Sequence, residues 1–188
     1  MTTVWLFVVG LGMLLALGTW CGIRLRVEYR TRSKPTFLTV AIVWTMYGIH
    51  FILTLVAAAN STWLFPLPRL LSMVGGILFL VAGASVYAAA VVAFRSMSRL
   101  SGLNSSRLIT VGIYRWSRNP QYLGWTLFLV GIALLRTSGM VLLLAALFWI
   151  SYRMYLPSEE RLLERIYGEE YRMYRSQTHR YFGPPRQR

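Results

Sequence analysis

The sequence predicts an all-α, polytopic integral membrane protein with about five transmembrane helices and a C-terminal amphipathic helix at the cytoplasmic surface. Hydrophobic residues make up 56% of the 188 residues, and the mean hydropathy is +0.50. Because one crossing takes about 20 apolar residues, a chain of this length holds several crossings and little else. We therefore expect a single membrane domain over residues 1–188, with an N-terminal three-helix part at 1–94 and a C-terminal part at 95–188.

Five apolar runs supply the predicted crossings, at Val4–Ile23, Thr36–Ala59, Leu70–Phe94, Tyr122–Leu135 and Met140–Leu156. Each run must be helical inside the membrane, since lipid offers no partners for backbone polar groups. The first run lacks the basic start and the cleavage site of a signal peptide, so we expect a retained helix. The last two runs are shorter and separated by only a few residues, which predicts a helical hairpin.

Basic residues fix the predicted orientation. Every Lys and Arg except Arg69 and Arg136 falls on the side that holds the C-terminus. By the positive-inside rule that side is cytoplasmic and the N-terminus faces outward, and a prokaryotic plasma membrane is the expected location. The basic excess also favours anionic lipid headgroups, at about 1 kcal/mol per basic residue near the surface. These basic residues do not belong to a recognised nucleic-acid-binding motif, so nucleic-acid binding is not expected.

The few metal-ligating side chains exclude several kinds of site. Cys21 is the only cysteine, which rules out an intrachain disulfide and a cysteine-based zinc site. His50 and His179 lie far apart in the sequence and make a poor metal site, so no metal is expected. We interpret His50 as a neutral histidine bonded to a neighbouring helix, with a place in the wall of a substrate cavity as the alternative.

The first polar motif is Gly112–Gly124, which reads GIYRWSRNPQYLG. Pro120 disfavours a helical Asn119 and suits the first turn of a helix, so the fourth crossing should begin at about Pro120. Gly124 and Gly131 lie on nearly one face and leave room for a close partner, either a helix or a flat ligand ring. Free amides at the helix start favour an anionic group. The alternative is an interfacial loop with snorkelling arginines.

The second polar motif is Pro157–Gly183, which holds five of the six glutamates. Pro157 and Ser158 are predicted to end the fifth crossing, with Ser158 as the N-cap of a new helix. Glu159 and Glu160 then fall in its first turn, where the helix dipole favours carboxylates. Apolar and aromatic residues recur at spacings of three and four residues, as in an amphipathic helix. The alternative is a membrane-surface helix, although such helices prefer basic polar faces.

The predicted topology places both motifs on the cytoplasmic side, at the mouth of the predicted hairpin. A pocket there would have aromatic walls, arginines, a helix N-terminus and one or two carboxylates. Such a pocket suits a ligand with an aromatic base, a sugar and both charges.

Together the two motifs resemble a known family. The pattern G-x-Y-x-x-x-R-N-P-x-Y-x-G, an apolar hairpin, and then E-E-x-x-L-x-x-x-Y-G-E-E-Y-x-x-Y is similar to the isoprenylcysteine carboxyl methyltransferase and phospholipid methyltransferase superfamily. The resemblance covers Gly112–Gly183. It implies S-adenosylmethionine as the methyl donor, a cofactor site in the C-terminal part 95–188, and a lipid-like acceptor that enters from the bilayer. That acceptor would be the carboxylate or amine of an isoprenoid or phospholipid type of molecule.

The resemblance also implies site residues. The cofactor would be bound by Tyr114, Arg118, Asn119, Pro120, Tyr122, Gly124, Glu159, Glu160, Tyr171 and Tyr174. A carboxylate acceptor needs an arginine to orient it, for which Arg118 and Arg153 are the first choices. An amine acceptor must lose a proton, which a glutamate such as Glu160 could take. Asn119 stands where the isoprenylcysteine enzymes usually have histidine, so the acceptor and the choice between O- and N-methylation stay open.

Two further function classes stay open beside this one. Membrane sterol reductases share a distantly similar C-terminal pattern and use a nicotinamide cofactor, but they are usually longer. A non-catalytic membrane protein could keep the same scaffold for lipid binding or assembly. The oligomeric state is not predicted.

Overall fold

The protein is described by a computed structural model over residues 2–32, 34–95, 100–103 and 107–186. Its long helices are α1 (Thr2–Thr31), α2 (Phe37–Ala59), α3 (Arg69–Phe94), α5 (Pro120–Arg136) and α6 (Gly139–Tyr167), followed by the short α7 (Glu169–Gln177). A 3₁₀ turn, η1, covers Gly112–Arg115. None of the residues in these ranges forms a strand, which confirms the all-α prediction. Arg99 and Arg188, two of the cytoplasmic basic residues predicted above, lie outside the described ranges.

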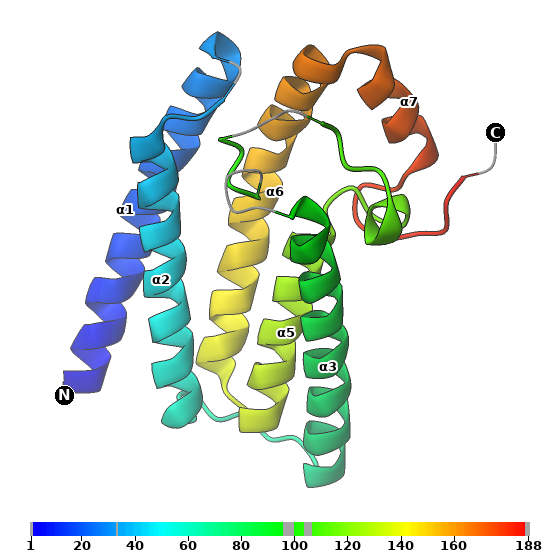
Figure 1. Ribbon diagram of the computed structural model, residues 1–188. Helices are drawn as coiled ribbons and strands as arrows, with labels where there is room; N and C mark the ends of the chain where they lie inside the picture. The colour runs from blue at the N-terminus through cyan, green and yellow to red at the C-terminus, as the bar shows by residue number, and fades with distance from the viewer. Residues whose placement is uncertain (1, 33, 96–99, 104–106, 187–188) are drawn as a thin grey trace.

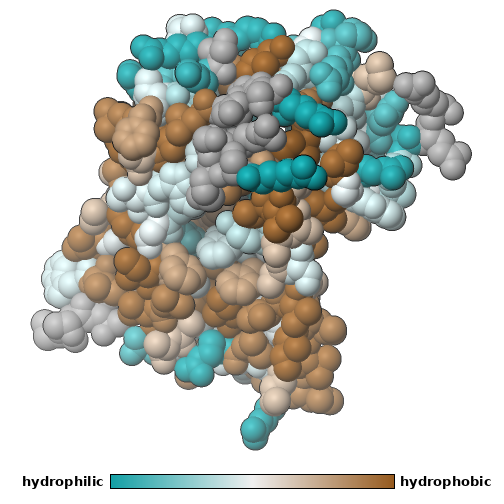
Figure 2. Space-filling model, viewed as in Figure 1, coloured by the Kyte–Doolittle hydropathy of each residue, from teal (hydrophilic) through white to brown (hydrophobic). Residues whose placement is uncertain are grey.

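The long helices run side by side, with α1 and α2 on one side, α3 and α5 on the other, and α6 between them (Figure 1). The α7 helix and the C-terminal tail lie together at one end of this bundle. Brown, hydrophobic atoms cover much of the lateral surface, while teal, hydrophilic atoms gather at the α7 end (Figure 2). The distribution is that of an integral membrane protein whose α7 end carries the larger polar surface.

Four of the described helices are long and apolar enough to cross a membrane: α1, α2, α3 and α6. The fifth predicted crossing is α5, whose 17 residues span about 25 Å at 1.5 Å per residue. That length is slightly less than the roughly 30 Å of a bilayer's hydrocarbon core. The chain turns from α5 into α6 through Thr137 and Ser138, and Ser138 caps α6 by accepting from the Val141 amide. The hairpin is present, and five crossings remain a prediction.

The predicted helix boundary at Pro157 is wrong. The α6 helix passes through Pro157 without a break and ends ten residues later, at Tyr167. A proline inside a helix costs about 3 kcal/mol, but Leu156, Glu160 and Leu162 are buried on either side of it and hold the helical path. Ser158 is therefore not an N-cap. Gly168 follows Tyr167 as the C-cap of α6, and its positive φ of 53° is a conformation that glycine adopts readily.

Close approach of α3 and α5 depends on glycines that face each other. A Cβ built on Gly83 would lie 2.3 Å from the Phe128 amide nitrogen, and one on Gly124 would lie 2.5 Å from that of Tyr87. On Gly131 it would meet the Leu80 amide nitrogen at 2.4 Å. These neighbours are backbone atoms that no rotamer change can move. The partner expected beside Gly124 and Gly131 is thus a helix and not a ligand ring.

Polar contacts hold the end of α1 against α2 and α6. Glu28 is only 2% exposed and accepts from the backbone amide and hydroxyl of Thr36 and from the Thr39 hydroxyl. On the other side, the Arg165 guanidinium of α6 donates to the carbonyls of residues 29, 30 and 32. The last carbonyls of a helix have no hydrogen-bond donors within the helix, and at the end of α1 the Arg165 guanidinium provides donors for them. These contacts position the part of α1 that faces the site.

Candidate functional site

A cavity of about 300 Å³ lies between α1, α2 and α6 and continues to the segment around η1 and α7. Its polar end is lined by Arg118, Asn119, Glu159, Glu160 and Tyr171. Its other end, called here the apolar arm, is lined by Leu14, Leu15, Met46, His50 and Leu147. The apolar arm lies within the part of the bundle whose outer surface is hydrophobic.

The two polar motifs meet at Glu160. One oxygen of this carboxylate lies 3.0 Å from Arg118 Nη1, and Arg180 donates to both oxygens at 3.1 and 2.5 Å. The side chains of Arg118 and Glu160 are 9% and 7% exposed, so this ion pair is largely shielded from water. Arg118 Nη1 also donates to the Tyr171 hydroxyl at 3.4 Å. Burial and the nearby Glu160 charge raise the pKa of Tyr171 to about 12, which keeps its hydroxyl protonated.

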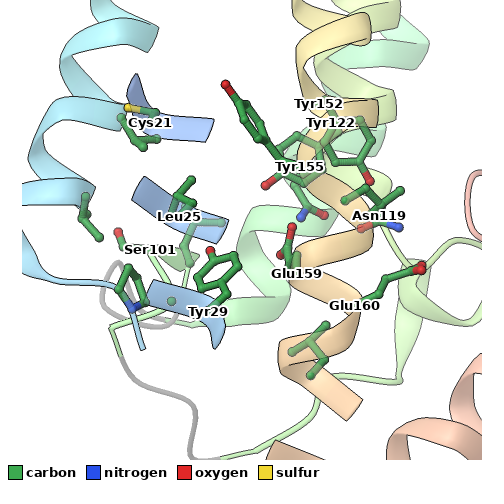
Figure 3. A pocket seen from close by; sticks show the side chains of 18 of the residues that line it. Cys21, Leu25, Tyr29, Ser101, Asn119, Tyr122, Tyr152, Tyr155, Glu159 and Glu160 are labelled. Atoms are coloured by element: carbon green, nitrogen blue, oxygen red, sulfur yellow. The ribbon is translucent and has the colours of Figure 1, made fainter. Parts of the chain in front are cut away.

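Glu159 lies in a different environment from its neighbour. The two side chains leave α6 in different directions, and Glu159 points to the side where Tyr29 of α1 lies (Figure 3). Within the described ranges, no basic side chain lies within ion-pair distance of Glu159. The cavity therefore has one carboxylate held by two arginines and one that is available to a ligand.

Tyrosine rings form much of the cavity wall beside Glu159. Tyr122 of α5 and Tyr152 of α6 stack with ring centroids 3.8 Å apart and an interplanar angle of 24°. At the polar end, the Tyr174 hydroxyl donates to the Tyr114 carbonyl at 2.8 Å, and the Tyr114 hydroxyl donates to Gln121. Aromatic rings of this kind can pack on a flat ligand ring and can contact a cation.

Three buried polar atoms have no hydrogen-bond partner among the described residues: His50 Nδ1, Arg118 Nε and Tyr152 Oη. All three belong to residues that line this one cavity. Buried polar groups are normally paired, so their concentration here indicates a place where a ligand completes the bonding.

The C-terminal tail closes the polar end. The Arg118 amide donates to the His179 carbonyl at 2.9 Å, and the Asn119 side chain donates to the Arg180 carbonyl at 3.0 Å. Further along, the Gly183 amide donates to the Trp116 carbonyl, and Phe182 stacks on the Trp116 ring. Residues 179–183, called here the tail strap, are thereby fixed to the loop that carries Arg118.

Most of the predicted site residues line the cavity, namely Tyr114, Arg118, Asn119, Tyr122, Glu159, Glu160, Tyr171 and Tyr174. The other three are not among its lining residues. Pro120 starts α5, and Gly124 packs on α3. Arg153 is exposed, and its guanidinium lies 5.8 Å from the centroid of the Tyr181 ring.

Sequence reasoning missed several lining residues, including Tyr29, Arg107, Tyr152 and Tyr155. The sequence spacing in α6 could have identified two of them, Tyr152 and Tyr155. Residues three, four and seven apart share a helix face, so a helix that continues through Pro157 places Tyr152 and Tyr155 with Glu159. The wrong boundary at Pro157 concealed that face. His50 fits both of its interpretations, because it lines the cavity and its Nε2 lies 3.1 Å from the Leu144 carbonyl.

The fold and the site define a class of protein, a polytopic helical membrane protein with a charged, tyrosine-lined cavity that extends into an apolar arm. A family model described as phospholipid methyltransferase matches residues 71–170, which include nearly all of α3, all of α5 and α6, the whole first polar motif and about half of the second. The chain belongs to the phospholipid methyltransferase family and is thus a membrane methyltransferase.

Curated relatives agree with this family. Protein-S-isoprenylcysteine O-methyltransferase A of Arabidopsis thaliana is 26% identical over 144 residues, which cover 73% of each chain. A probable protein-S-isoprenylcysteine O-methyltransferase of Oryza sativa subsp. indica is 27% identical over 109 residues, 55% of this chain and 57% of its own. The protein-S-isoprenylcysteine O-methyltransferase of Mus musculus is 28% identical over 108 residues, which cover 38% of its length. No solved structure matches the chain.

Proposed function

We propose that the chain transfers a methyl group from S-adenosylmethionine to a lipid-like acceptor at the cytoplasmic face of a membrane. The observation that carries this proposal is the 3.0 Å contact between Arg118 and Glu160. It joins the two polar motifs at one cavity, and that cavity continues into an apolar arm. A charged site beside an apolar arm suits a polar cofactor and an acceptor with a lipid tail.

The donor and acceptor groups of the cavity fit the proposed cofactor. S-adenosylmethionine carries an amino group, a carboxylate, ribose hydroxyls and an aromatic base. Glu159 would hold the amino group or the ribose hydroxyls, since Glu160 is already bound by two arginines. The free Nε of Arg118 would donate to the carboxylate, and the tyrosine wall would contact the base.

The chemistry places modest demands on the chain. When bound, the cofactor supplies an already activated sulfonium methyl group. The residues of the cavity then hold the two reactants in line and exclude water, and orientation of this kind is worth roughly 7–11 kcal/mol. The tail strap and α7 cover the polar end of the cavity and so help to exclude water from it.

The acceptor determines which side chain acts on it. An amine acceptor must lose a proton, and of the two cavity carboxylates Glu159 is the one for which the described residues supply no arginine partner. A carboxylate acceptor needs a cation, and among the described residues Arg107 and Arg118 are the arginines that line the cavity. Arg153 does not line it, so we do not assign it a role in the reaction.

Calorimetry on protein in lipid nanodiscs tests the cofactor site. We expect S-adenosylmethionine and its demethylated product to bind and NADPH not to bind. Glu159→Gln removes one charge-assisted hydrogen bond of about 1.5–3 kcal/mol, so the Kd should rise about 10- to 150-fold. Arg153→Ala is the matched control and should change the Kd less than twofold.

Other outcomes point to other functions. Binding of NADPH alone would favour the reductase class, and binding of neither cofactor by folded protein would favour a non-catalytic scaffold. An unchanged Kd for Glu159→Gln would contradict the assignment of Glu159. The acceptor is found by transferring a labelled methyl group to a total lipid extract and identifying the products by mass spectrometry.

A further inference from the structure

The apolar arm contains one histidine ring with a fixed orientation. His50 of α2 is 6% exposed and lines the arm together with Leu14, Leu15, Met46 and Leu147. Its Nε2 lies 3.1 Å from the Leu144 carbonyl of α6, and its ring centroid lies 5.8 Å from that of Phe148. These contacts hold the ring between two helices.

The contact with Leu144 determines the tautomer of the ring. A carbonyl oxygen can only accept a hydrogen bond, so Nε2 must carry the hydrogen. In the neutral imidazole the other nitrogen, Nδ1, is then an acceptor with a free lone pair. Nδ1 is buried and has no partner among the described residues. The ring thus presents an unused acceptor inside an otherwise mostly apolar part of the cavity.

This acceptor is far from the charged end. Leu144 and Glu159 lie on the same helix, and their spacing corresponds to about 22 Å along its axis at 1.5 Å per residue. A group that reacts beside Glu159 therefore does not reach His50. The body of a long ligand that extends along the arm does.

We propose that His50 Nδ1 forms a second polar subsite, which accepts a hydrogen bond from an O–H or N–H group on the body of the acceptor lipid. The subsite rests on the proposed function in that its ligand is the methyl acceptor. It selects hydroxylated or amide-linked lipids over lipids whose tails are plain hydrocarbon, because only the former bring a donor to this depth.

Nitrogen-15 NMR of histidine-labelled protein in nanodiscs tests the subsite without turnover. The chain has only two histidines, and His179→Asn assigns their signals. The probes are 1-hexadecanol and its methyl ether, which share a chain but differ in the donor. We expect Nε2 of His50 to be protonated and Nδ1 to be bare. The Nδ1 resonance should shift with the alcohol and stay in place with the ether.

Two results would overturn the proposal. One is a protonated Nδ1, which would reverse the tautomer. The other is an Nδ1 signal that responds identically to both probes, as expected if a trapped water or no ligand occupies the subsite. Both readouts are taken on the unaltered chain, and the variant His179→Asn serves only to assign the signals.

A variant links the subsite to the acceptor. His50→Phe keeps an aromatic ring beside Phe148 and removes the acceptor nitrogen. In the labelled lipid extract, methylation of donor-bearing lipids should fall at least tenfold relative to other products. Binding of S-adenosylmethionine should change less than twofold. An unchanged product profile contradicts the subsite, whereas absent cofactor binding in the wild type contradicts the proposed function instead.

Discussion

Two adjacent glutamates with the same chemistry occupy different environments. Glu160 forms ion pairs with Arg118 and Arg180, whereas Glu159 faces the tyrosine wall of the cavity. Successive residues of a helix differ by about 100° in direction, since a turn takes 3.6 residues. Neighbours in sequence can therefore serve different partners. The motif E-E predicted a carboxylate site, but only the fold shows which carboxylate is available.

Removal of the Glu160 charge should destabilise the protein. Glu160→Gln leaves the buried Arg118 short of its counter-charge, and breaking such a pair costs about 3–5 kcal/mol. The double variant Arg118→Met with Glu160→Leu should recover most of that loss. Unfolding in detergent, followed by circular dichroism, measures the free energy.

Glu169→Gln is the matched control for this prediction. Its carboxylate pairs with Arg172, but both side chains are more than half exposed. Exposed pairs contribute about 0–1 kcal/mol, so this variant should unfold almost like the wild type. An equal loss from both glutamate variants would show that the burial of the Glu160 pair has no energetic effect.

At the level of helices, α3 and α5 approach each other most closely, at the glycines that face each other. Gly124→Ala would place a methyl group against the backbone of α3 at Tyr87. Because α5 begins just after Asn119, separation of the two helices should also displace the loop that carries Arg118. We expect reduced thermal stability and weaker cofactor binding.

Gly48→Ala provides the control for the glycine contact. A Cβ at Gly48 would have nothing within 4 Å, and alanine is favoured over glycine in a helix by about 1 kcal/mol. This variant should be as stable as the wild type or slightly more so. The melting temperatures of both variants are compared in the same detergent. Equal values would contradict the close contact between α3 and α5.

The helices also show which features a sequence can predict. Hydropathy located α2 and α3 within one residue at each end, because apolar residues cover nearly their whole length. It placed the end of α1 at Ile23, but the helix continues to Thr31, where Glu28 and Arg165 make polar contacts. Local rules stopped a helix at Pro157, whereas packing on both sides of the proline continues it. Local propensity therefore failed where tertiary contacts decide.

At the scale of the whole molecule, the predicted topology can be tested with single cysteines. Cys21 is buried, so it gives little background and can be replaced by serine. Asn60→Cys lies in the connection between α2 and α3, and Arg186→Cys lies beyond α7. In intact cells, an impermeant maleimide should label the first and reach the second only after permeabilisation. The opposite pattern would reverse the orientation.

The candidate site was predictable to the extent that it follows from motifs. Arg118, Asn119 and Glu160 were found because two polar motifs stand out beside apolar runs. Tyr29 was not assigned to the site, and His50 only as an alternative, since α1 and α2 carry no such motif and only the packing of the bundle brings them to the cavity. Arg153 was assigned to the site but is exposed. It lies on the face of α6 that it shares with Glu160, two helical turns away, and not on the face of Glu159.

The tail strap has a consequence for biosynthesis. Residues 179–183 bind the loop of Arg118, and Arg180 completes the contacts of Glu160. A ribosome that has inserted all the long helices has therefore not yet released the residues that close the polar end. The nascent chain passes through a stage in which its membrane bundle is assembled but its site is open. The polar end of the cavity is closed only when residues 179–183 have emerged from the ribosome and have docked on the loop of Arg118.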